Sequence, residues 1–164
     1  MHITKRPGLA ADVEFTRSVH HRAYREVVVV QYGRWNEEAQ DGFFLAAWSM
    51  APHDVILCDD VRCGYMCVED RDDDIHVREL VIDPDFQGNG IGTHILRDVI
   101  ERAIARGVPV RLATHRLNRA ENLYRRIGFR ESGRTDSHIL MEWNREHDAA
   151  QQALATDSVE SGGY

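Results

Sequence analysis

A run of glycines lies where a predicted strand passes into a predicted helix. The segment reads Asp83-Pro84-Asp85-Phe86-Gln87-Gly88-Asn89-Gly90-Ile91-Gly92. Glycines allow successive backbone N–H groups to face one point, and the N-terminus of the following helix adds about half a positive charge there. The segment therefore predicts a site that binds phosphate groups through its backbone.

Three kinds of phosphate site, and a tight turn without a ligand, compete for this segment. A P-loop needs a lysine before the final hydroxyl residue, whereas Gly92 is followed directly by Thr93. A dinucleotide site needs the spacing G-x-G-x-x-G after the first strand, whereas the spacing here is G-x-G-x-G after the fourth. A pyrophosphate site for coenzyme A is the remaining phosphate interpretation.

The elements around this segment predict an α+β fold with a mixed sheet and helices on both faces. Alternating or continuous apolar runs predict seven strands, and periodic apolar stripes predict four helices. The predicted strands are His2–Arg6, Val55–Cys58, Arg62–Glu69, Ile75–Ile82, Val108–Thr114, Phe129–Arg134 and His138–Trp143. The predicted helices are Ala10–Val28, Asn36–Trp48, a helix from Ile91 that ends at Gly107, and Asn118–Ile127.

Length and charge limit the class of protein. With 164 residues the chain makes one domain, expected over residues 1–144, followed by a polar tail over 145–164 that is frayed or disordered. The net charge of −7 argues against nucleic acid as a partner, and ten arginines between Arg97 and Arg134 favour a small polyanionic ligand. The longest aliphatic run, Val27–Val30, is too short to span a membrane, and no signal peptide is visible, so a cytoplasmic location is expected.

No metal site is expected. The three cysteines are interpreted as core or half-buried residues, because Cys63 and Cys67 would lie about 13 Å apart along one strand. The nine histidines show no spacing typical of a metal centre.

Two motifs make the chain resemble the GNAT acyltransferases, the Gcn5-related N-acetyltransferase superfamily. Gln87-Gly88-Asn89-Gly90-Ile91-Gly92 is similar to the signature Q/R-x-x-G-x-G/A of that family. The segment from Asn118 to Phe129 is similar to its pattern N-x-A-x-x-L-Y-x-x-x-G-F. The resemblance covers about residues 1–144 and implies a mostly antiparallel seven-stranded sheet that splays between its fourth and fifth strands.

The resemblance implies coenzyme A, as acetyl-CoA, for the cofactor and assigns its contacts. Backbone groups of the fourth strand would pair with the pantetheine arm, and the glycine loop would bind the pyrophosphate. Arg97, Arg119, Arg125 and Arg126 are equal candidates for the 3′-phosphate. The implied cofactor-binding residues are Leu80, Val81, Ile82, Gln87, Gly88, Asn89, Gly90, Ile91, Gly92, Thr93 and Asn118.

Two residues are expected to move protons. The resemblance gives Tyr124 the role of donating a proton to the departing thiolate, with a packed core tyrosine as the alternative. Glu79 is the candidate base that takes the proton of the amine; by strand alternation it shares a face with Val77 and Val81. The alternatives are a carboxylate paired with a nearby arginine and a base replaced by a water relay.

The expected activity is acetyl-CoA-dependent N-acetylation of a primary amine, by direct attack through a tetrahedral intermediate. The alternative is a non-catalytic acyl-CoA-binding module of the same fold. Tyr32 and Trp35 are candidate acceptor contacts, because aromatic rings beside acidic charge suit a cationic amine; a packed helical lid is the alternative. The acceptor is expected to be a small-molecule or peptide amine, and the homodimers common in this family leave the oligomeric state open.

Overall fold

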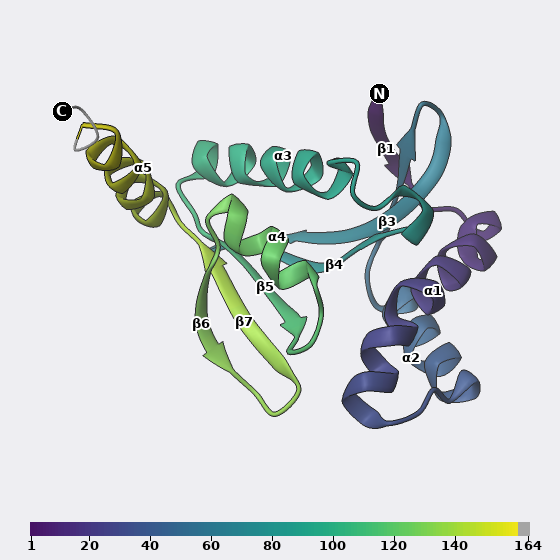
Figure 1. Cartoon of the computed structure of the whole chain (residues 1–164). Helices are drawn as coiled ribbons and strands as arrows, with labels where there is room; N and C mark the ends of the chain where they lie inside the picture. The colour runs from purple at the N-terminus through teal and green to yellow at the C-terminus, as the bar shows by residue number, and fades with distance from the viewer. Residues whose placement is uncertain (161–164) are drawn as a thin grey trace. The chain divides into compact units, whose positions relative to one another are not determined.

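The computed structural model describes residues 1–160, and of residues 151 and 155–160 only the backbone. It contains one seven-stranded sheet in the order β1-β2-β3-β4-β5-β7-β6 (Figure 1). The strands are β1 (Ile3–Pro7), β2 (Asp54–Cys58), β3 (Val61–Asp70), β4 (Ile75–Ile82), β5 (Val110–His115), β6 (Arg130–Arg134) and β7 (His138–Trp143). The α-helices are α1 (Val13–Tyr32), α2 (Glu37–Met50), α3 (Ile91–Arg106), α4 (Ala120–Ile127) and α5 (Arg145–Glu160), and 3₁₀ turns cover Ala10–Asp12 and Pro84–Phe86.

The sheet is mixed, as the sequence predicts. The pairs β1–β2, β2–β3, β5–β7 and β6–β7 are antiparallel. The neighbours β4 and β5 are joined by helix α3, and such a crossover makes a parallel pair. The predicted α+β class and the mostly antiparallel open sheet are therefore confirmed.

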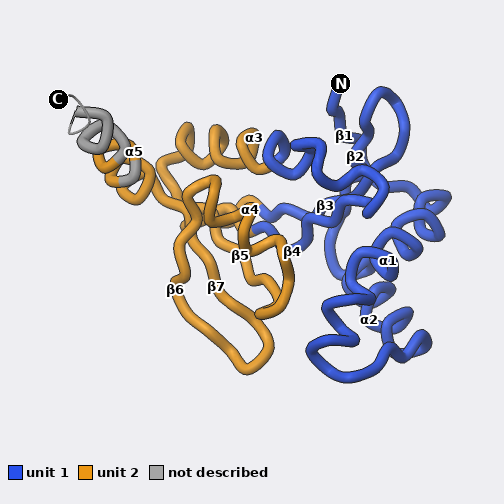
Figure 2. Tube along the Cα trace, viewed as in Figure 1, with its two compact units in different colours: residues 1–69, 77–95 blue, residues 70–76, 96–164 orange. Residues whose placement is uncertain are grey.

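The chain divides into two compact units, shown in blue and orange in Figure 2. The first comprises residues 1–69 and 77–95, and the second comprises residues 70–76 and 96–160 of the described chain. The division falls within β4, whose first residues belong to the second unit and whose remainder belongs to the first.

In the first unit, helices α1 and α2 pack on one face of strands β3 and β4. The buried cluster there contains Val19 of α1, Phe44 of α2, Tyr65 of β3 and Val81 of β4. Asn36 caps the start of α2, because its Oδ1 accepts the N–H of Ala39 at 2.9 Å. This packing fixes which face of β4 lies under the two helices.

A buried carboxylate joins three parts of the first unit. Asp12, whose side chain is 3% exposed, binds the guanidinium groups of Arg6 at 2.7 Å and Arg62 at 3.1 Å. Its Oδ2 also accepts the N–H of Leu9 at 2.8 Å. Asp12 thereby connects β1, the start of α1 and β3.

In the second unit, strand β7 lies between β5 and β6. Its register with β5 runs from Val110 opposite Trp143 to His115 opposite His138. The pairing with β6 shifts between Glu131 and Gly133, which is a bulge. Trp143 and Met141 are buried, so β7 supplies a large part of the core of this unit.

The bounds of the elements differ from the predicted ones by a few residues. Helix α1 begins later than predicted and continues through Val27–Val30 to Tyr32, where Gly33 takes a left-handed conformation and donates to Val29 O. The tail over 145–164 was expected to be frayed or disordered; residues 145–160 form α5, and residues 161–164 lie outside the described residues.

Candidate active site

The glycine loop begins where β4 ends, in the first unit. The N–H of Asp83 donates to Cys63 O at 2.8 Å, and the buried Asp83 carboxylate accepts the N–H of Asp85 at 2.9 Å. Arg22 of α1 binds both Asp83 and Asp85 at 3.0 Å. The entry to the loop is therefore fixed by hydrogen bonds and ion pairs.

The backbone N–H groups of residues 88–93 have no acceptor among the described residues. The first helical hydrogen bond at this end runs from His94 N to Gly90 O at 3.0 Å, which leaves the N–H groups of residues 88–93 unpaired. Gly88 and Gly90 have φ of 78° and 80°, and a Cβ added at either would meet nothing within 4 Å. Unpaired donors, open space and the N-terminus of the long helix α3 together fit a pyrophosphate group.

Two side chains of the loop bind the loop itself. Gln87 Nε2 donates to Ile82 O at 3.0 Å, and Asn89 Nδ2 donates to Phe86 O at 3.0 Å. These amides hold the shape of the loop while its backbone donors stay unpaired. That Gln87 and Asn89 contact a ligand directly stays a prediction.

Strand β4 carries the candidate base. Val81 is buried in the cluster under α1 and α2, and Glu79 shares its face by strand alternation. Glu79 Oε2 lies 2.9 Å from Nε2 of His53, a residue of the short connection between α2 and β2. The partner of Glu79 is thus a histidine and not an arginine, and sequence reasoning did not find it.

Helix α4 of the second unit carries the candidate proton donor. The Tyr124 side chain is buried and meets the ring of Phe129 edge-on, with 5.7 Å between centroids. Gly128 adopts φ 113°, which lets the chain turn so that Phe129 packs there. Burial raises the pKa of Tyr124 to about 12, so the phenol keeps its proton at neutral pH.

Asn118 lies immediately before α4. Its Oδ1 accepts the N–H of Ala120 at 3.0 Å, so it caps the first turn of that helix. Its predicted contact with the pantetheine arm is not tested by this arrangement and stays a prediction.

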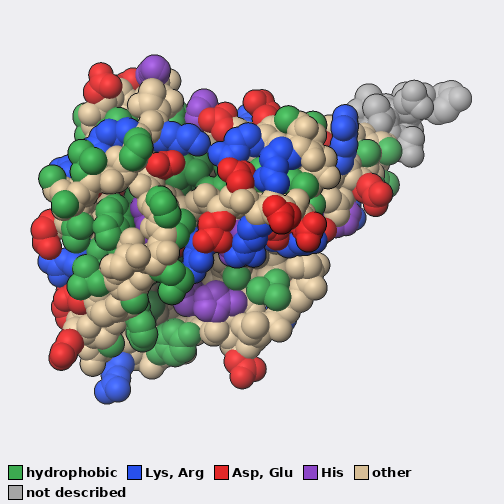
Figure 3. Space-filling model, turned by 180° about the vertical axis from the view of Figure 1, so that it is seen from behind, with side chains coloured by type: hydrophobic (Ala, Val, Ile, Leu, Met, Phe, Trp, Pro, Cys, Tyr) green, Lys and Arg blue, Asp and Glu red, His purple; other side chains and the backbone are tan. Residues whose placement is uncertain are grey.

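Many arginines of the segment 97–134 are already paired. Arg102 and Arg106 bind Asp70, Arg111 binds Asp74 and Glu142, Arg125 binds Glu121, and Arg134 binds Glu131. Figure 3 shows acidic and basic side chains interspersed over one face of the molecule. Of the four candidates for the 3′-phosphate, Arg97 and Arg126 are exposed and form no ion pair among the described residues.

The two residues proposed to contact the acceptor have partners near their own helices. Tyr32 Oη is bound by Gln31 Nε2 at 2.9 Å, and Trp35 Nε1 donates to Glu37 Oε2 at 2.6 Å. Trp48 stacks on His53, the partner of the candidate base, with 4.8 Å between centroids.

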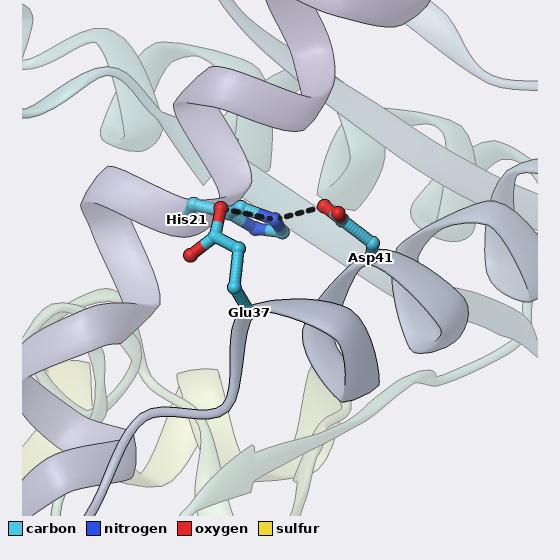
Figure 4. Close-up of side chains that lie close together, drawn as sticks. All are labelled: His21, Glu37 and Asp41. Atoms are coloured by element: carbon cyan, nitrogen blue, oxygen red, sulfur yellow. Dashed lines mark hydrogen bonds and ion pairs between the residues drawn. The ribbon is translucent and has the colours of Figure 1, made fainter.

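A second group of ionisable side chains lies between α1 and α2. Figure 4 shows His21, Glu37 and Asp41 pointing toward one another. His21 Nε2 lies 2.6 Å from Asp41 Oδ1 and 3.7 Å from Glu37 Oε1. Arg17 binds the same Asp41 oxygen at 2.9 Å, so this carboxylate already has a cationic partner. The hydrogen bond from His21, with that from Arg17, lowers the pKa of Asp41.

Comparison with known proteins places the chain in a family. The family model of the acetyltransferase (GNAT) domain matches residues 41–131. The chain therefore belongs to the GNAT acetyltransferases, as its two motifs predict. A curated relative, an uncharacterised N-acetyltransferase of Methanocaldococcus jannaschii, is 31% identical over 104 residues. That match covers 61% of this chain and 44% of the relative, so the chain corresponds to less than half of the relative's length.

Solved structures share the fold. The PaiA N-acetyltransferase of Thermoplasma acidophilum, solved in complex with coenzyme A, matches with a TM-score of 0.71 at 18% identity, over 88% of this chain and 99% of that one. The ribosomal-protein-S18-alanine N-acetyltransferase of Escherichia coli matches with a TM-score of 0.60 at 20% identity, over 86% and 92% of the two chains. Within the described residues, no helix combines the length and the apolar character needed to cross a membrane.

Proposed function

We propose that this chain is an acetyl-CoA-dependent N-acetyltransferase that moves an acetyl group to a primary amine by direct attack. One observation carries the proposal: the N–H groups of residues 88–93 are unpaired at the start of α3, in a chain that belongs to the GNAT family. The fold shared with a neighbour that was solved with coenzyme A supports the choice of cofactor.

The cofactor contacts follow from the loop and the adjoining strand. The N–H groups of Gly88, Asn89, Gly90, Ile91, Gly92 and Thr93 bind the pyrophosphate, and the backbone of Leu80–Ile82 pairs with the pantetheine arm. Arg97 and Arg126 are the preferred candidates for the 3′-phosphate, because their charges are not neutralised by described partners. When bound, acetyl-CoA supplies a thioester whose carbonyl carbon is open to attack by an amine.

Glu79 accepts the proton of the amine. An amine of lysine type has a pKa of about 10.4, so reaching its neutral form at pH 7 costs about 4.6 kcal/mol. A base in contact with that amine typically contributes about 10²–10⁴-fold in rate. The Glu79 side chain is 20% exposed, and its partner His53 lies beside the ring of Tyr65; a carboxylate near aromatic rings suits a cationic substrate.

Tyr124 donates a proton to the departing thiolate. Its phenol is protonated at neutral pH, because burial raises its pKa to about 12. A protonated phenol can donate a hydrogen bond to a sulfur atom that gains negative charge.

The acceptor is a small-molecule or peptide amine that is cationic in solution. Of the residues expected to contact it, Tyr32 is 57% exposed, and its ring is therefore accessible to a ligand. The Trp35 ring lies within 5.8 Å of the Arg25 guanidinium carbon, which already occupies one cation site on this indole.

Titration calorimetry tests the cofactor. Coenzyme A is expected to bind at micromolar concentrations, whereas NAD is not. Gly90→Glu is expected to abolish binding, because a carboxylate would enter the site at a backbone angle that favours glycine.

Gly107→Glu is the matched control. Gly107 has φ 68° and also meets nothing within 4 Å, but it lies at the other end of α3. The control should bind coenzyme A with unchanged affinity. Binding of NAD instead, or equal affinity in the two variants, would contradict the placement of the cofactor.

A screen of amines with release of free thiol from acetyl-CoA tests catalysis. At least one cationic amine should give turnover above hydrolysis in wild type and Gly107→Glu, and none in Gly90→Glu. Tight binding of coenzyme A without turnover on any amine would indicate a non-catalytic acyl-CoA-binding module.

A further inference from the structure

His53 occupies a tightly fixed position between α2 and β2. Its backbone carbonyl accepts the N–H of Gly8 at 2.8 Å, and the next residue, Asp54, pairs with Pro7 in the β1–β2 ladder. A Cβ added at Gly8 would lie 2.9 Å from the Trp48 ring and 3.0 Å from His53 O. The close approach of these backbones leaves His53 little freedom to move.

Both ring nitrogens of His53 have partners. Nδ1 lies 2.8 Å from Ala51 O, and Nε2 lies 2.9 Å from Glu79 Oε2. A carbonyl oxygen only accepts, so Nδ1 must carry a hydrogen. A neutral ring would then present the lone pair of Nε2 to a carboxylate oxygen, which is repulsive. One proton therefore lies between Nε2 and Oε2, where it can bond to both atoms.

Two aromatic rings lie beside the ring of His53. Trp48 of α2 stacks on the His53 ring at 26°, and Tyr65 of β3 lies 6.0 Å from it, centroid to centroid. The side chain of His53 is 2% exposed and that of Glu79 is 20% exposed. In such surroundings a shared proton makes the pair neutral overall, which reduces the cost of burying the carboxylate.

The hydroxyl of Tyr65 is a further polar group near this pair. Tyr65 Oη is buried and has no hydrogen-bond partner among the described residues. Burial raises the pKa of Tyr65, and the charge of Glu79 raises it further. Tyr65 therefore stays a neutral phenol and places no second charge beside Glu79.

The pair leaves one carboxylate oxygen available. His53 engages Oε2 of Glu79, and Oε1 has no hydrogen bond to a described residue. A carboxylate held through one oxygen keeps a single orientation of its side chain, so the other oxygen is presented in a fixed direction. That is the property a general base needs, because proton transfer depends on hydrogen-bond geometry.

We propose that His53 is a positioning residue for Glu79, which shares one proton with it and fixes the oxygen that takes the proton of the acceptor amine. This inference rests on the proposed function, because it assigns Glu79 the role of base. The shared proton itself is a property of the free protein and does not depend on turnover.

The shared proton is tested by nuclear magnetic resonance of the full chain with ¹⁵N-labelled histidine. In the wild-type protein, His53 should show hydrogen on both ring nitrogens. His53→Gln should remove this pattern and so assign it, and Glu79→Gln should leave hydrogen on Nδ1 alone. A wild-type His53 with one protonated nitrogen, or two protonated nitrogens that survive Glu79→Gln, would overturn the shared proton.

The positioning role is tested with the amine found in the acceptor screen. His53→Leu should lower kcat by about 10²-fold, the loss expected from misplacing a catalytic group by about 1 Å, with little change in the KM for acetyl-CoA. His53→Gln should recover most of the loss, because its amide can donate to Glu79 Oε2 without titrating.

The matched control is Glu142→Gln in β7. Glu142 is a strand carboxylate paired with Arg111, and its side chain is 21% exposed, close to the 20% of Glu79. Its kcat should stay within twofold of wild type. Equal losses in His53→Leu and His53→Gln, or no loss in His53→Leu, would overturn the positioning role.

Failure of the proposed function would give a different result from failure of the positioning role alone. A wild-type chain that does not bind coenzyme A refutes the cofactor assignment, and with it the positioning role, whatever the histidine spectrum shows. Coenzyme A affinity also reports folding of each variant, so loss of kcat in a variant that still binds coenzyme A is not unfolding.

Discussion

Two histidine–carboxylate pairs lie in the first unit, and they differ in what surrounds them. In one, His21 is 12% exposed and Asp41 is 33% exposed. In the other, His53 is 2% exposed and Glu79 is 20% exposed. The atoms in contact are alike, a ring Nε2 and one carboxylate oxygen, at 2.6 Å and 2.9 Å.

The difference lies in the neighbouring charges. Asp41 Oδ1 accepts hydrogen bonds from both His21 and Arg17, and Glu37 lies close to His21. Acidic and basic groups therefore lie next to one another in this pair. Around Glu79 and His53 the contacts are a carbonyl oxygen and aromatic rings. The comparison teaches that the two carboxylates differ in the charge beside them: Asp41 is bound by a guanidinium as well as a histidine, whereas Glu79 is bound by a histidine alone among the described residues.

The largest effect on kcat is expected from neutralising Glu79, and neutralising Asp41 should have almost none. Glu79→Gln should lower kcat by about 10²–10⁴-fold, because the amine loses its base. Asp41→Asn should leave kcat within about twofold. Steady-state rates with saturating acetyl-CoA measure kcat for both variants. Similar losses of kcat in the two variants would contradict a catalytic difference between the two histidine–carboxylate pairs.

A smaller loss of rate is expected at the proton donor. Tyr124→Phe should lower kcat by about 10²-fold with little change in coenzyme A affinity, because the thiolate leaves without its proton. The pKa of Tyr124 is raised to about 12, so its ionisation should cause no decline in activity below about pH 11. Wild-type turnover in Tyr124→Phe would show that this tyrosine only packs against Phe129.

Asp12 extends the comparison to a carboxylate that is almost fully buried. The hydrogen bond from Arg6 lowers its pKa below the ordinary 3.8. A carboxylate with a lowered pKa stabilises the fold above about pH 4 and loses that contribution as the pH falls. Asp12→Asn should lower the free energy of unfolding at pH 7 by about 2 kcal/mol, as urea unfolding would measure. An unchanged unfolding midpoint would contradict this role.

The Asp41 carboxylate should also stabilise the fold above about pH 4 and lose that contribution as the pH falls, but by less than Asp12. Its pKa is also lowered, mainly by His21, but the site is accessible to water and ions, which screen the interaction. Asp41→Asn should make the unfolding temperature depend less steeply on pH below about pH 4. In 1 M salt the difference from wild type should shrink, and a difference that grew with salt would contradict an ion pair.

The sequence predicted those features whose physical cause is local. The glycine loop follows from backbone angles that only Gly88 and Gly90 adopt easily, and α4 with Gly128 and Phe129 follows from a short motif. The order of strands and helices was also predictable from apolar periodicity. The ends of elements were harder to predict. Helix α1, for example, continues through Val27–Val30 until Gly33 ends it.

Contacts between distant segments were not predictable. His53 and Glu79 are 26 residues apart and belong to a loop and a strand, so no spacing joins them. Asp12 likewise meets Arg62 across 50 residues. Tyr32 and Trp35 were predicted as acceptor contacts from composition, which does not show that Gln31 and Glu37 already bind them.

The most direct test of the account is the response of backbone amides to coenzyme A, followed by ¹H–¹⁵N correlation spectra of the full chain. The N–H signals of residues 88–93 should shift on saturation, and those of residues 33 and 107, glycines outside the loop, should not. Binding of coenzyme A that leaves the signals of residues 88–93 unmoved would contradict a pyrophosphate held by this loop.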